Sequence, residues 1–311
     1  MIFSWIYEKE ETIQMKTFLR SKGISKSLLA TIKFDGGSIW LNGKERTVLA
    51  TLKKGDKVMI RIPDEGEHET TVGVDMPLDI LFEDDHFLIV NKPFGAASIP
   101  SKVHPRLSMA NRVKGYYQRQ GYVDQVIHIV TRLDRDTTGV MLFARHGYAH
   151  ALMDTLLRNK EVDKTYRAVL SEPVLTQPHG FIDAPIGRTE DSIMTRMVRE
   201  DGKQALTEYW LDKTYPDGQT VKIKLHTGRT HQIRVHFTSI GAPLLGDDLY
   251  GGKADPEMLR QALHCESLAF VHPISGEPLK IEAPLPDDFI KWESRQRDKE
   301  ADVRVGTTIG I

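Results

Sequence analysis

The sequence predicts an α+β fold in two domains, and three observations support this. The chain of 311 residues is too long for one small domain and long enough for two, each with its own core. Apolar residues between positions 12 and 35 recur at helical spacing, whereas many apolar segments after position 77 are short and bounded by turn residues, as in strands. The acidic, turn-prone stretch 64–76 between them is predicted to be a linker.

The N-terminal domain, residues 1–63, is expected to hold two short helices followed by a hairpin. The helical pattern breaks at Gly23, and Ser25 is a candidate N-cap for the second helix. A strand then meets an Asn42-Gly43 turn, which is typical of a hairpin, and a second turn and strand follow. The basic residues of the helices suit either RNA binding or a solvated helix face; these are Arg20, Lys22, Lys26 and Lys33.

The second domain is expected to begin near Pro77 with two strands, 78–82 and 87–90, joined by a hairpin turn. Residues 103–121 are basic and contain Tyr116 and Tyr117, a pattern that suits contact with an RNA strand or, equally, an exposed amphipathic helix. Farther along, one helical face is predicted to pack on the sheet through Tyr148, Ala151, Leu152, Thr155 and Leu156.

A charged loop is predicted between strands at 126–130 and 140–144. It contains Asp134, which lies between Arg132 and Arg135. Charge between two strands is costly unless it serves chemistry, and a loop on a rigid scaffold is a common way to position a reactive carboxylate. Asp134 is therefore the leading catalytic candidate.

Two later segments could complete a site with this loop. Alternation in the strand 164–170 puts Tyr166 on one face, from which its ring could stack on a base, although a lone strand tyrosine is usually half-buried core. After Gly228, Thr230 is a candidate cap for a helix that buries Ile233, Phe237 and Ile240. Arg234 then lies on a neighbouring face and could pair with Asp134.

The remaining segments carry weaker signals. Residues 177–204 are expected to form loops, with Arg188, Arg196 and Arg199 as candidate phosphate contacts, before strands at 205–211 and 221–225. The segment 263–273 is expected to be a closing strand. The tail 293–311 is expected to be disordered.

Composition limits the classes of function. No apolar run reaches the roughly 18 to 20 residues of a membrane span, and the N-terminus lacks the pattern of a signal peptide. With Cys265 as the single cysteine, neither an intramolecular disulfide nor a cysteine-based zinc site can form, so a cytoplasmic protein is expected. The net charge of −1 argues against an indiscriminate polyanion binder but allows a local basic groove.

Three motifs in order resemble the RluA-type pseudouridine synthases, which isomerise uridine in structured RNA. They are R-L-D-R-D-T-T-G at 132–139, K-T-Y-R-A at 164–168 and G-R-T-H-Q-I-R-V-H at 228–236. The segments 91–95 and 263–273 resemble further blocks of the family. The resemblance implies a catalytic domain over 77–292 built on a mixed, mainly antiparallel sheet with flanking helices. The N-terminal domain resembles the alpha-L RNA-binding motif of a small-subunit ribosomal protein.

The resemblance also implies a site. Asp134 would be the catalytic carboxylate, Tyr166 the aromatic partner of the base, and Arg234 the ion-pair partner that favours the charged form of Asp134. Whether the carboxylate attacks the sugar or abstracts a proton stays open, and no metal or cofactor is expected. The family usually has histidine where Thr131 stands. The expected RNA contacts are Arg132, Lys92, Lys164, Arg229, His231 and Gln232.

Two other classes of function stay open at this level. Asp134-Arg135-Asp136 is a D-x-D pattern that could hold a divalent metal, although flanking arginines oppose a cation. A non-catalytic RNA-binding module, with the charged loop as an ion-pair network, is the other. For the enzyme, large-subunit ribosomal RNA is the preferred substrate because an N-terminal RNA-binding domain is commoner in family members that modify it; transfer RNA is the alternative. A monomer is expected.

Overall fold

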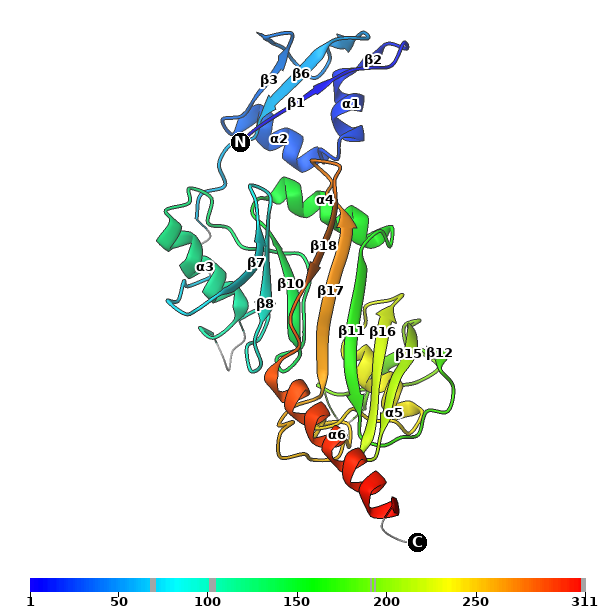
Figure 1. The fold of residues 1–311 in the computed structure, drawn as a ribbon. Helices are drawn as coiled ribbons and strands as arrows, with labels where there is room; N and C mark the ends of the chain where they lie inside the picture. The colour runs from blue at the N-terminus through cyan, green and yellow to red at the C-terminus, as the bar shows by residue number, and fades with distance from the viewer. Residues whose placement is uncertain (68–70, 101–104, 191, 193, 309–311) are drawn as a thin grey trace.

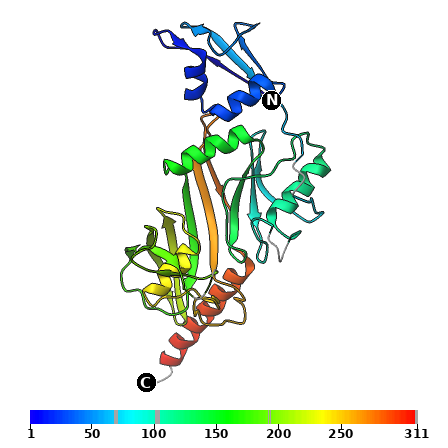
Figure 2. The same cartoon turned by 180° about the vertical axis from the view of Figure 1, so that it is seen from behind.

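The computed structural model describes residues 1–67, 71–100, 105–190, 192 and 194–308. A small N-terminal part lies at one end of the molecule, a large sheet forms the middle, and the C-terminal helix lies at the other end (Figures 1 and 2). The sheet therefore connects two outlying parts of the chain and carries the loops between them. Among the described residues, no helix is long and apolar enough to cross a membrane.

The N-terminal part has the helices and hairpin that the sequence predicts. Ser25 Oγ accepts a hydrogen bond of 3.1 Å from Leu28 N, which confirms it as the N-cap of α2. Asn42 and Gly43 both have positive φ, as the predicted turn requires. A strand at the very start of the chain, β1, was not predicted and pairs with β6. The elements are β1 (Ile2–Ile6), β2 (Ile13–Gln14), α1 (Met15–Ser21), α2 (Lys26–Phe34), β3 (Ser38–Leu41), β4 (Lys44–Glu45), β5 (Thr51–Leu52) and β6 (Lys57–Arg61).

The large sheet has ten strands, and its main path runs β12-β15-β16-β11-β17-β10-β8-β7. Strands β10 and β17 run parallel, while the other neighbouring pairs are antiparallel, so the predicted mixed, mainly antiparallel sheet is confirmed. The strands are β7 (Asp79–Glu83), β8 (Phe87–Lys92), β9 (His128–Ile129), β10 (Thr138–Ala144), β11 (Asp163–Leu170), β12 (His179–Asp183), β15 (Leu206–Tyr215), β16 (Gly218–Leu225), β17 (Leu263–Val271) and β18 (Pro278–Glu282).

The segment 177–204 is more regular than predicted. It contains β12 at the edge of the large sheet and a separate hairpin of β13 (Ile186–Arg188) and β14 (Arg196–Val198). The expectation of loops alone was wrong because short strands with basic, outward-facing side chains lack the apolar alternation by which a strand is recognised.

Helices α3 (Met109–Gln120) and α4 (Gly147–Arg158) pack differently from the predictions. Tyr117 is only 1% exposed and lies in a core cluster, so it cannot stack on RNA. In α4, Tyr148 and Leu152 pack against the N-terminal part, whereas Ala149 and Met153 pack on the sheet. The helix thus has two buried faces, because it lies between the sheet and the N-terminal part (Figure 1).

The last helix, α6 (Asp287–Thr308), replaces the expected disorder over 293–308; positions 309–311 lie outside the described residues. Trp292 and Gln296 are fully buried, and Gln296 Nε2 donates to Asp217 Oδ2 at 3.0 Å. The disorder prediction was wrong because a polar helix can be held by a few buried residues that its composition does not reveal.

Candidate active site

The loop that carries Asp134 connects β9 to β10 and is held from beneath by buried side chains. Ser98 Oγ donates to Leu133 O at 2.7 Å and accepts from Leu133 N at 3.0 Å. Lys92 Nζ donates to Arg135 O at 2.7 Å, and Arg260 Nη1 donates to Asp136 O at 3.1 Å. The backbone carbonyls of the loop therefore have fixed donors, which keeps the loop from rearranging freely.

Lys92, a predicted RNA contact, lies beneath the loop and not on the rim of this site. It is 0% exposed, and burial lowers the pKa of its ammonium group to about 7, with the charge of Asp136 opposing that shift. This placement does not support the prediction, because Lys92 ends β8 on the inner side of the loop, where its amine donates to the carbonyl oxygens of Pro93 and Arg135.

Thr131, which stands where the family usually has histidine, helps to anchor the same loop. Its Oγ1 accepts a hydrogen bond of 2.9 Å from Leu142 N, and its own N–H donates to Leu142 O at 3.2 Å. The side chain is 6% exposed. A small hydroxyl at this position therefore fixes the start of the loop to β10.

Gly139, at the end of the loop, allows β10 to lie close to β17. Its φ is +108°, and a Cβ atom there would lie 2.1 Å from Cys265 O. Gly139 and Cys265 are register partners in the one parallel strand pair described above. A side chain at position 139 would therefore push the two strands apart and displace Asp134.

Arg234 lies between two carboxylates. It comes from α5 (Gln232–Ser239), and its Nε and Nη2 each donate to Asp247 at 2.7 Å. Its Nη1 lies 3.7 Å from Asp134 Oδ2. Burial acts to lower the pKa of Arg234, but the hydrogen bonds and charge of Asp247 outweigh it, so the pKa is raised.

Arg234 is therefore brought together with Asp134 as predicted, but its surroundings are not those predicted. It is 5% exposed, although the periodicity placed it off the core, and Asp247 is 0% exposed. Sequence reasoning missed Asp247. The one signal available was an acidic and aromatic run, Asp247 to Tyr250, bounded by Gly246 and Gly251, both of which have positive φ.

His231 and Tyr250 form the second contact to the carboxylate. His231 Nε2 lies 3.9 Å from Asp134 Oδ2, and its Nδ1 is 2.9 Å from the Tyr250 hydroxyl. Burial lowers the pKa of His231, which the charge of Asp134 partly opposes, so the ring is neutral near pH 7. When Tyr250 donates to Nδ1, the ring proton is on Nε2, which faces Asp134.

His231 also replaces the predicted helix cap. It is the N-cap residue of α5, with φ of 56°, and makes no side-chain cap bond; Thr230 does not cap the helix. Gln232 is 2% exposed and uses all its polar capacity within the protein, with partners Thr227, Arg229 N, Leu206 O and Thr207. Its side chain fixes the turn into α5, and these internal hydrogen bonds do not support the prediction that it contacts RNA.

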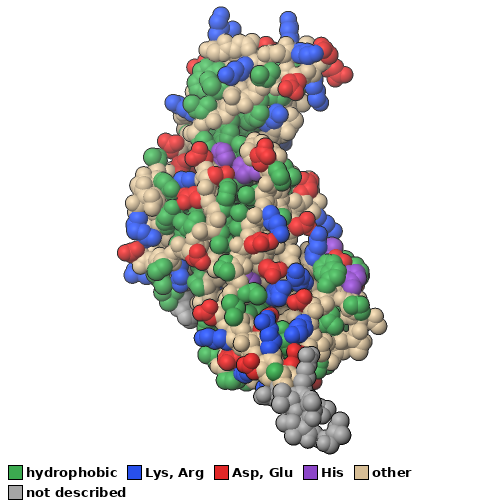
Figure 3. Space-filling model, in the orientation of Figure 1, with side chains coloured by type: hydrophobic (Ala, Val, Ile, Leu, Met, Phe, Trp, Pro, Cys, Tyr) green, Lys and Arg blue, Asp and Glu red, His purple; other side chains and the backbone are tan. Residues whose placement is uncertain are grey.

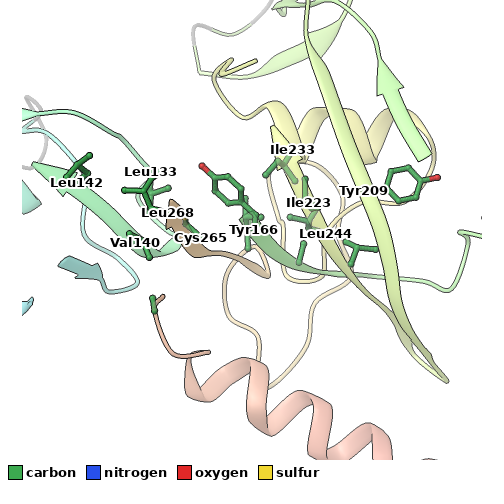
Figure 4. Close-up of a cluster of buried hydrophobic side chains, with 14 of the residues drawn as sticks. Leu133, Val140, Leu142, Tyr166, Tyr209, Ile223, Ile233, Leu244, Cys265 and Leu268 are labelled. Carbon is green, nitrogen blue, oxygen red and sulfur yellow. The ribbon is translucent and has the colours of Figure 1, made fainter. Parts of the chain in front are cut away.

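The catalytic loop and the start of α5 line a pocket of about 510 Å³. Its wall includes Asp134, Arg234 and Tyr166. The Tyr166 ring points between the Leu133 side and the Ile233 side of the pocket (Figure 4). Tyr166 is 5% exposed, and burial raises the pKa of its hydroxyl well above its usual value. A pocket that combines an aromatic ring and apolar side chains with a carboxylate can hold a flat base next to a sugar.

The basic residues predicted to contact RNA lie on the rim of this pocket. Arg132 is exposed and forms no hydrogen bond or ion pair with a described residue, while Arg229 is exposed and donates from Nε to Gln204 O at 2.9 Å. Lys164 is half-buried in the pocket wall, and burial lowers its pKa. Figure 3 shows basic side chains scattered among acidic ones over the viewed face of the molecule.

Nothing in the site favours the D-x-D metal hypothesis. Asp134 faces Arg234, and Asp136 pairs with Arg135 through Nη2 at 2.8 Å. Over the described part of the chain, no group of three or more His, Cys, Asp or Glu side chains is arranged to hold a metal ion. Each aspartate of the pattern thus has a cationic neighbour in the protein.

Comparison with known proteins gives consistent matches. Residues 86–239 match the family model described as RNA pseudouridylate synthase. An uncharacterized RNA pseudouridine synthase of Bacillus subtilis, YjbO, is 46% identical over 277 residues, which is 89% of this chain and 97% of that protein. The ribosomal large subunit pseudouridine synthase D of Xanthomonas campestris is 34% identical over 85% of this chain and 83% of that protein.

Solved structures agree with the sequence matches. Human RNA pseudouridylate synthase domain containing 4 is 25% identical, with a TM-score of 0.58 over 70% of this chain and 93% of that chain. Human RNA pseudouridylate synthase domain containing 1 is also 25% identical, with a TM-score of 0.56 over 69% of this chain and 86% of that chain.

Proposed function

This chain belongs to the RluA family of RNA pseudouridine synthases, and from that premise we propose that it isomerises uridine in large-subunit ribosomal RNA with Asp134 as the catalytic carboxylate. The observation that carries the proposal is one pocket whose wall combines Asp134, Arg234 and Tyr166. Of the residues on that wall, Asp134 alone is an acid.

The reaction needs only what these side chains supply. The bond from ribose to the uracil ring nitrogen breaks, the base turns, and a ring carbon bonds to the sugar, so the atoms balance without transfer of electrons to another molecule. A carboxylate can stabilise charge at the sugar, act as the nucleophile or take a proton. Tyr166 would hold the detached base against the pocket wall, and Arg234 would orient the carboxylate from 3.7 Å.

Large-subunit ribosomal RNA is the substrate that the relatives favour. The ribosomal large subunit pseudouridine synthase D of Vibrio cholerae is 34% identical over 84% of this chain, in addition to the Xanthomonas protein. The N-terminal part supports an RNA of extended structure, because α1 and α2 carry basic residues that do not line the pocket; these are Arg20, Lys22, Lys26 and Lys33. Transfer RNA is the alternative substrate.

The test is pseudouridine mapping of total RNA from cells with and without the gene, complemented by wild type, Asp134→Asn or Asp154→Asn. Asp154 is an exposed carboxylate on α4 that pairs with Arg158, so it is a charge-matched control. We expect one or more sites in large-subunit ribosomal RNA to vanish on deletion and to return with wild type and Asp154→Asn but not with Asp134→Asn.

Three other outcomes separate the alternatives. Sites lost from transfer RNA alone would overturn the ribosomal substrate and leave the chemistry in place. Restoration by Asp134→Asn would overturn the role of Asp134. Purified protein that binds the RNA with unchanged affinity in both wild-type and Asp134→Asn form, with no site lost on deletion, would favour the non-catalytic RNA-binding module.

A further inference from the structure

A second pocket lies on the opposite side of the catalytic loop. It measures about 700 Å³ and is bounded by the end of β8, the start of α3 and the start of α6. Lys92, Thr138 and Arg260 belong to its wall, and each of them also contacts the loop or its neighbour strand. The volume falls in the range of sites that take small molecules or single nucleotides.

Arg112 provides an unused hydrogen-bond donor in this pocket. It lies one turn into α3, its Nε is buried, and no hydrogen-bond acceptor among the described residues reaches that nitrogen. Burial lowers the pKa of its guanidinium group. Other arginines nearby are paired, Arg119 with Asp75 and Arg260 with Asp288. The buried Nε itself is out of reach of a ligand, but Arg112 lines the pocket and its side chain forms no hydrogen bond or ion pair with a described residue, so the rest of its guanidinium group is available to an acceptor that a ligand brings.

Phe94 provides an aromatic surface at the mouth of the same pocket. Its side chain is 51% exposed, so its ring is accessible to a ligand. Phe94 also lines a smaller depression of about 220 Å³ together with Ala97 and Arg135. Ala97 and Arg135 in turn line the active-site pocket. The second pocket and the smaller depression therefore share Phe94, and the smaller depression and the active-site pocket share Arg135.

The charges of the pocket limit the class of ligand that it can bind. Its carboxylates are Asp79, Glu257, Asp287 and Asp288. Asp288 pairs with Arg260, Glu257 with Arg295, and Asp79 accepts from Asn91. The wall also carries the basic side chains Arg112 and Lys291, so one phosphate with an uncharged base suits the pocket better than a small polyanion, which the four acids would repel. That combination is a nucleotide.

We propose that this pocket binds a nucleotide of the RNA substrate that flanks the target uridine, with its base on Phe94 and an acceptor oxygen at Arg112. The inference rests on the proposed function. The target uridine would occupy the active-site pocket, and the strand would continue across Arg135 into the second pocket. Stacking on an exposed aromatic ring and one guanidinium contact are the usual elements of single-strand recognition.

The first experiment is kinetic and uses the full-length protein with an RNA fragment that contains the uridine found by mapping. Phe94→Leu and Arg112→Gln are compared with Phe181→Leu, an equally exposed phenylalanine on β12, and with Arg119→Gln on the same helix as Arg112. We expect each pocket variant to raise KM about fivefold to tenfold with kcat within about twofold of wild type, and the controls to change neither. Arg112→Lys, which keeps the charge, is expected to recover part of the KM.

Unchanged KM in both pocket variants would overturn the proposal. So would a fall in kcat at constant KM, because it would mean that Phe94 and Arg112 act through the catalytic loop rather than on RNA. Melting temperatures are measured for all variants; Phe94 is exposed, so its variant is expected to fold even if the Arg112 variant is unstable.

A second experiment separates this proposal from the proposed function. Large-subunit ribosomal RNA containing 4-thiouridine is photo-crosslinked to the wild-type protein, and the attached peptides are identified. Cross-links near both Phe94 and Tyr166 are expected. Cross-links at Tyr166 without any near Phe94 would overturn the second pocket alone, while absence of both would overturn the RNA substrate itself. A different result would be that uridine monophosphate binds saturably to the wild type and not to Arg112→Gln, while the kinetics on RNA stay unaltered. That result would show that the pocket binds a free nucleotide, and it would overturn the proposal that the nucleotide is part of the RNA substrate.

Discussion

Asp247 is the residue that fixes Arg234 opposite Asp134. It is fully buried and accepts two hydrogen bonds of 2.7 Å from the same guanidinium group. Charge-assisted bidentate pairs of this kind set both position and angle. The position of the proposed catalytic carboxylate therefore depends on a second carboxylate, which lies far later in the chain.

We expect Asp247→Asn to lower the single-turnover rate of pseudouridine formation about 10- to 100-fold, with little change in RNA affinity. The amide keeps one acceptor for Arg234 but loses the charge and the second acceptor, and misplacement of a catalytic partner by about 1 Å can cost a factor of that size. Asp248→Asn, at the exposed neighbouring position, is the control and should retain the wild-type rate. A wild-type rate for Asp247→Asn would show that Arg234 needs no such partner.

Substitutions at Tyr166 test whether the aromatic ring or its hydroxyl contributes to activity. The ring lies in the pocket wall, and the raised pKa of the hydroxyl keeps it protonated at neutral pH. We expect Tyr166→Phe to stay within about threefold of wild-type kcat/KM and Tyr166→Leu to lose about 5- to 100-fold, the cost of one lost stacking contact. Steady-state kinetics on the mapped RNA fragment measure both. A large loss in Tyr166→Phe would assign a role to the hydroxyl instead.

At the scale of elements, the strand pair β10 and β17 determines where the catalytic loop ends. Their parallel contact brings Gly139 against Cys265, and Thr138 Oγ1 lies 2.9 Å from His264 Nδ1. Arg260 Nη2 donates to the same Thr138 hydroxyl at 3.2 Å. A strand, a loop and the start of α6 therefore meet at the end of the Asp134 loop.

Gly139→Ala is expected to lower the free energy of unfolding by at least about 2 kcal/mol and to abolish activity. The added Cβ would lie 2.1 Å from Cys265 O at a φ of +108°, and neither backbone can move without breaking the strand pair. Urea denaturation measures the stability. Gly228→Ala is the control because a Cβ there would meet no atom within 4 Å; comparable losses in the two variants would contradict this account.

At the scale of the whole molecule, a histidine cluster lies where the N-terminal part meets the sheet (Figure 3). His86 Nδ1 and His146 Nε2 are 3.0 Å apart, and the ring of Phe3 lies 5.9 Å from that of His146. Burial, with a smaller effect from the nearby His86, lowers the pKa of His146 to about 4, and the charge of Glu65 opposes the shift. The two parts of the molecule therefore dock through rings that are neutral at pH 7.

Stability is expected to fall as the pH is lowered from about 6.5 to about 4. In that window the unfolded chain protonates His146 and the folded chain does not, so protons favour the unfolded state by about 1.4 kcal/mol per pH unit for this group. Below about pH 4 both states are protonated, and this contribution stops changing.

His146→Asn removes the titrating ring but keeps a side-chain acceptor for Ala149 N, the hydrogen bond that caps α4. We expect a shallower loss of stability with acid than in wild type, measured by urea denaturation at pH 7.5, 6.0 and 5.0. Parallel slopes for wild type and His146→Asn would contradict the assignment.

The sequence by itself determined the class of fold, most elements and the chemical type of the site. The Ser25 cap, the Asn42-Gly43 turn and the strands around Asp134 follow from local rules, because caps, turns and alternating strands depend on neighbours within a few residues. The joining of Asp134 and Arg234 was predicted through family motifs.

Only the tertiary structure decided which polar side chains are free. Lys92 and Gln232 look like RNA contacts in the sequence, yet their hydrogen bonds go to Arg135 O and Leu206 O, respectively. Ser98 and Arg260 carry no local signal, and Asp247 carries only that of a short acidic run between two glycines, although all three hold the catalytic loop or its arginine. The reason is physical: burial and hydrogen-bond partners are set by strands and helices far apart in sequence, and a buried polar group is defined by the partner it finds.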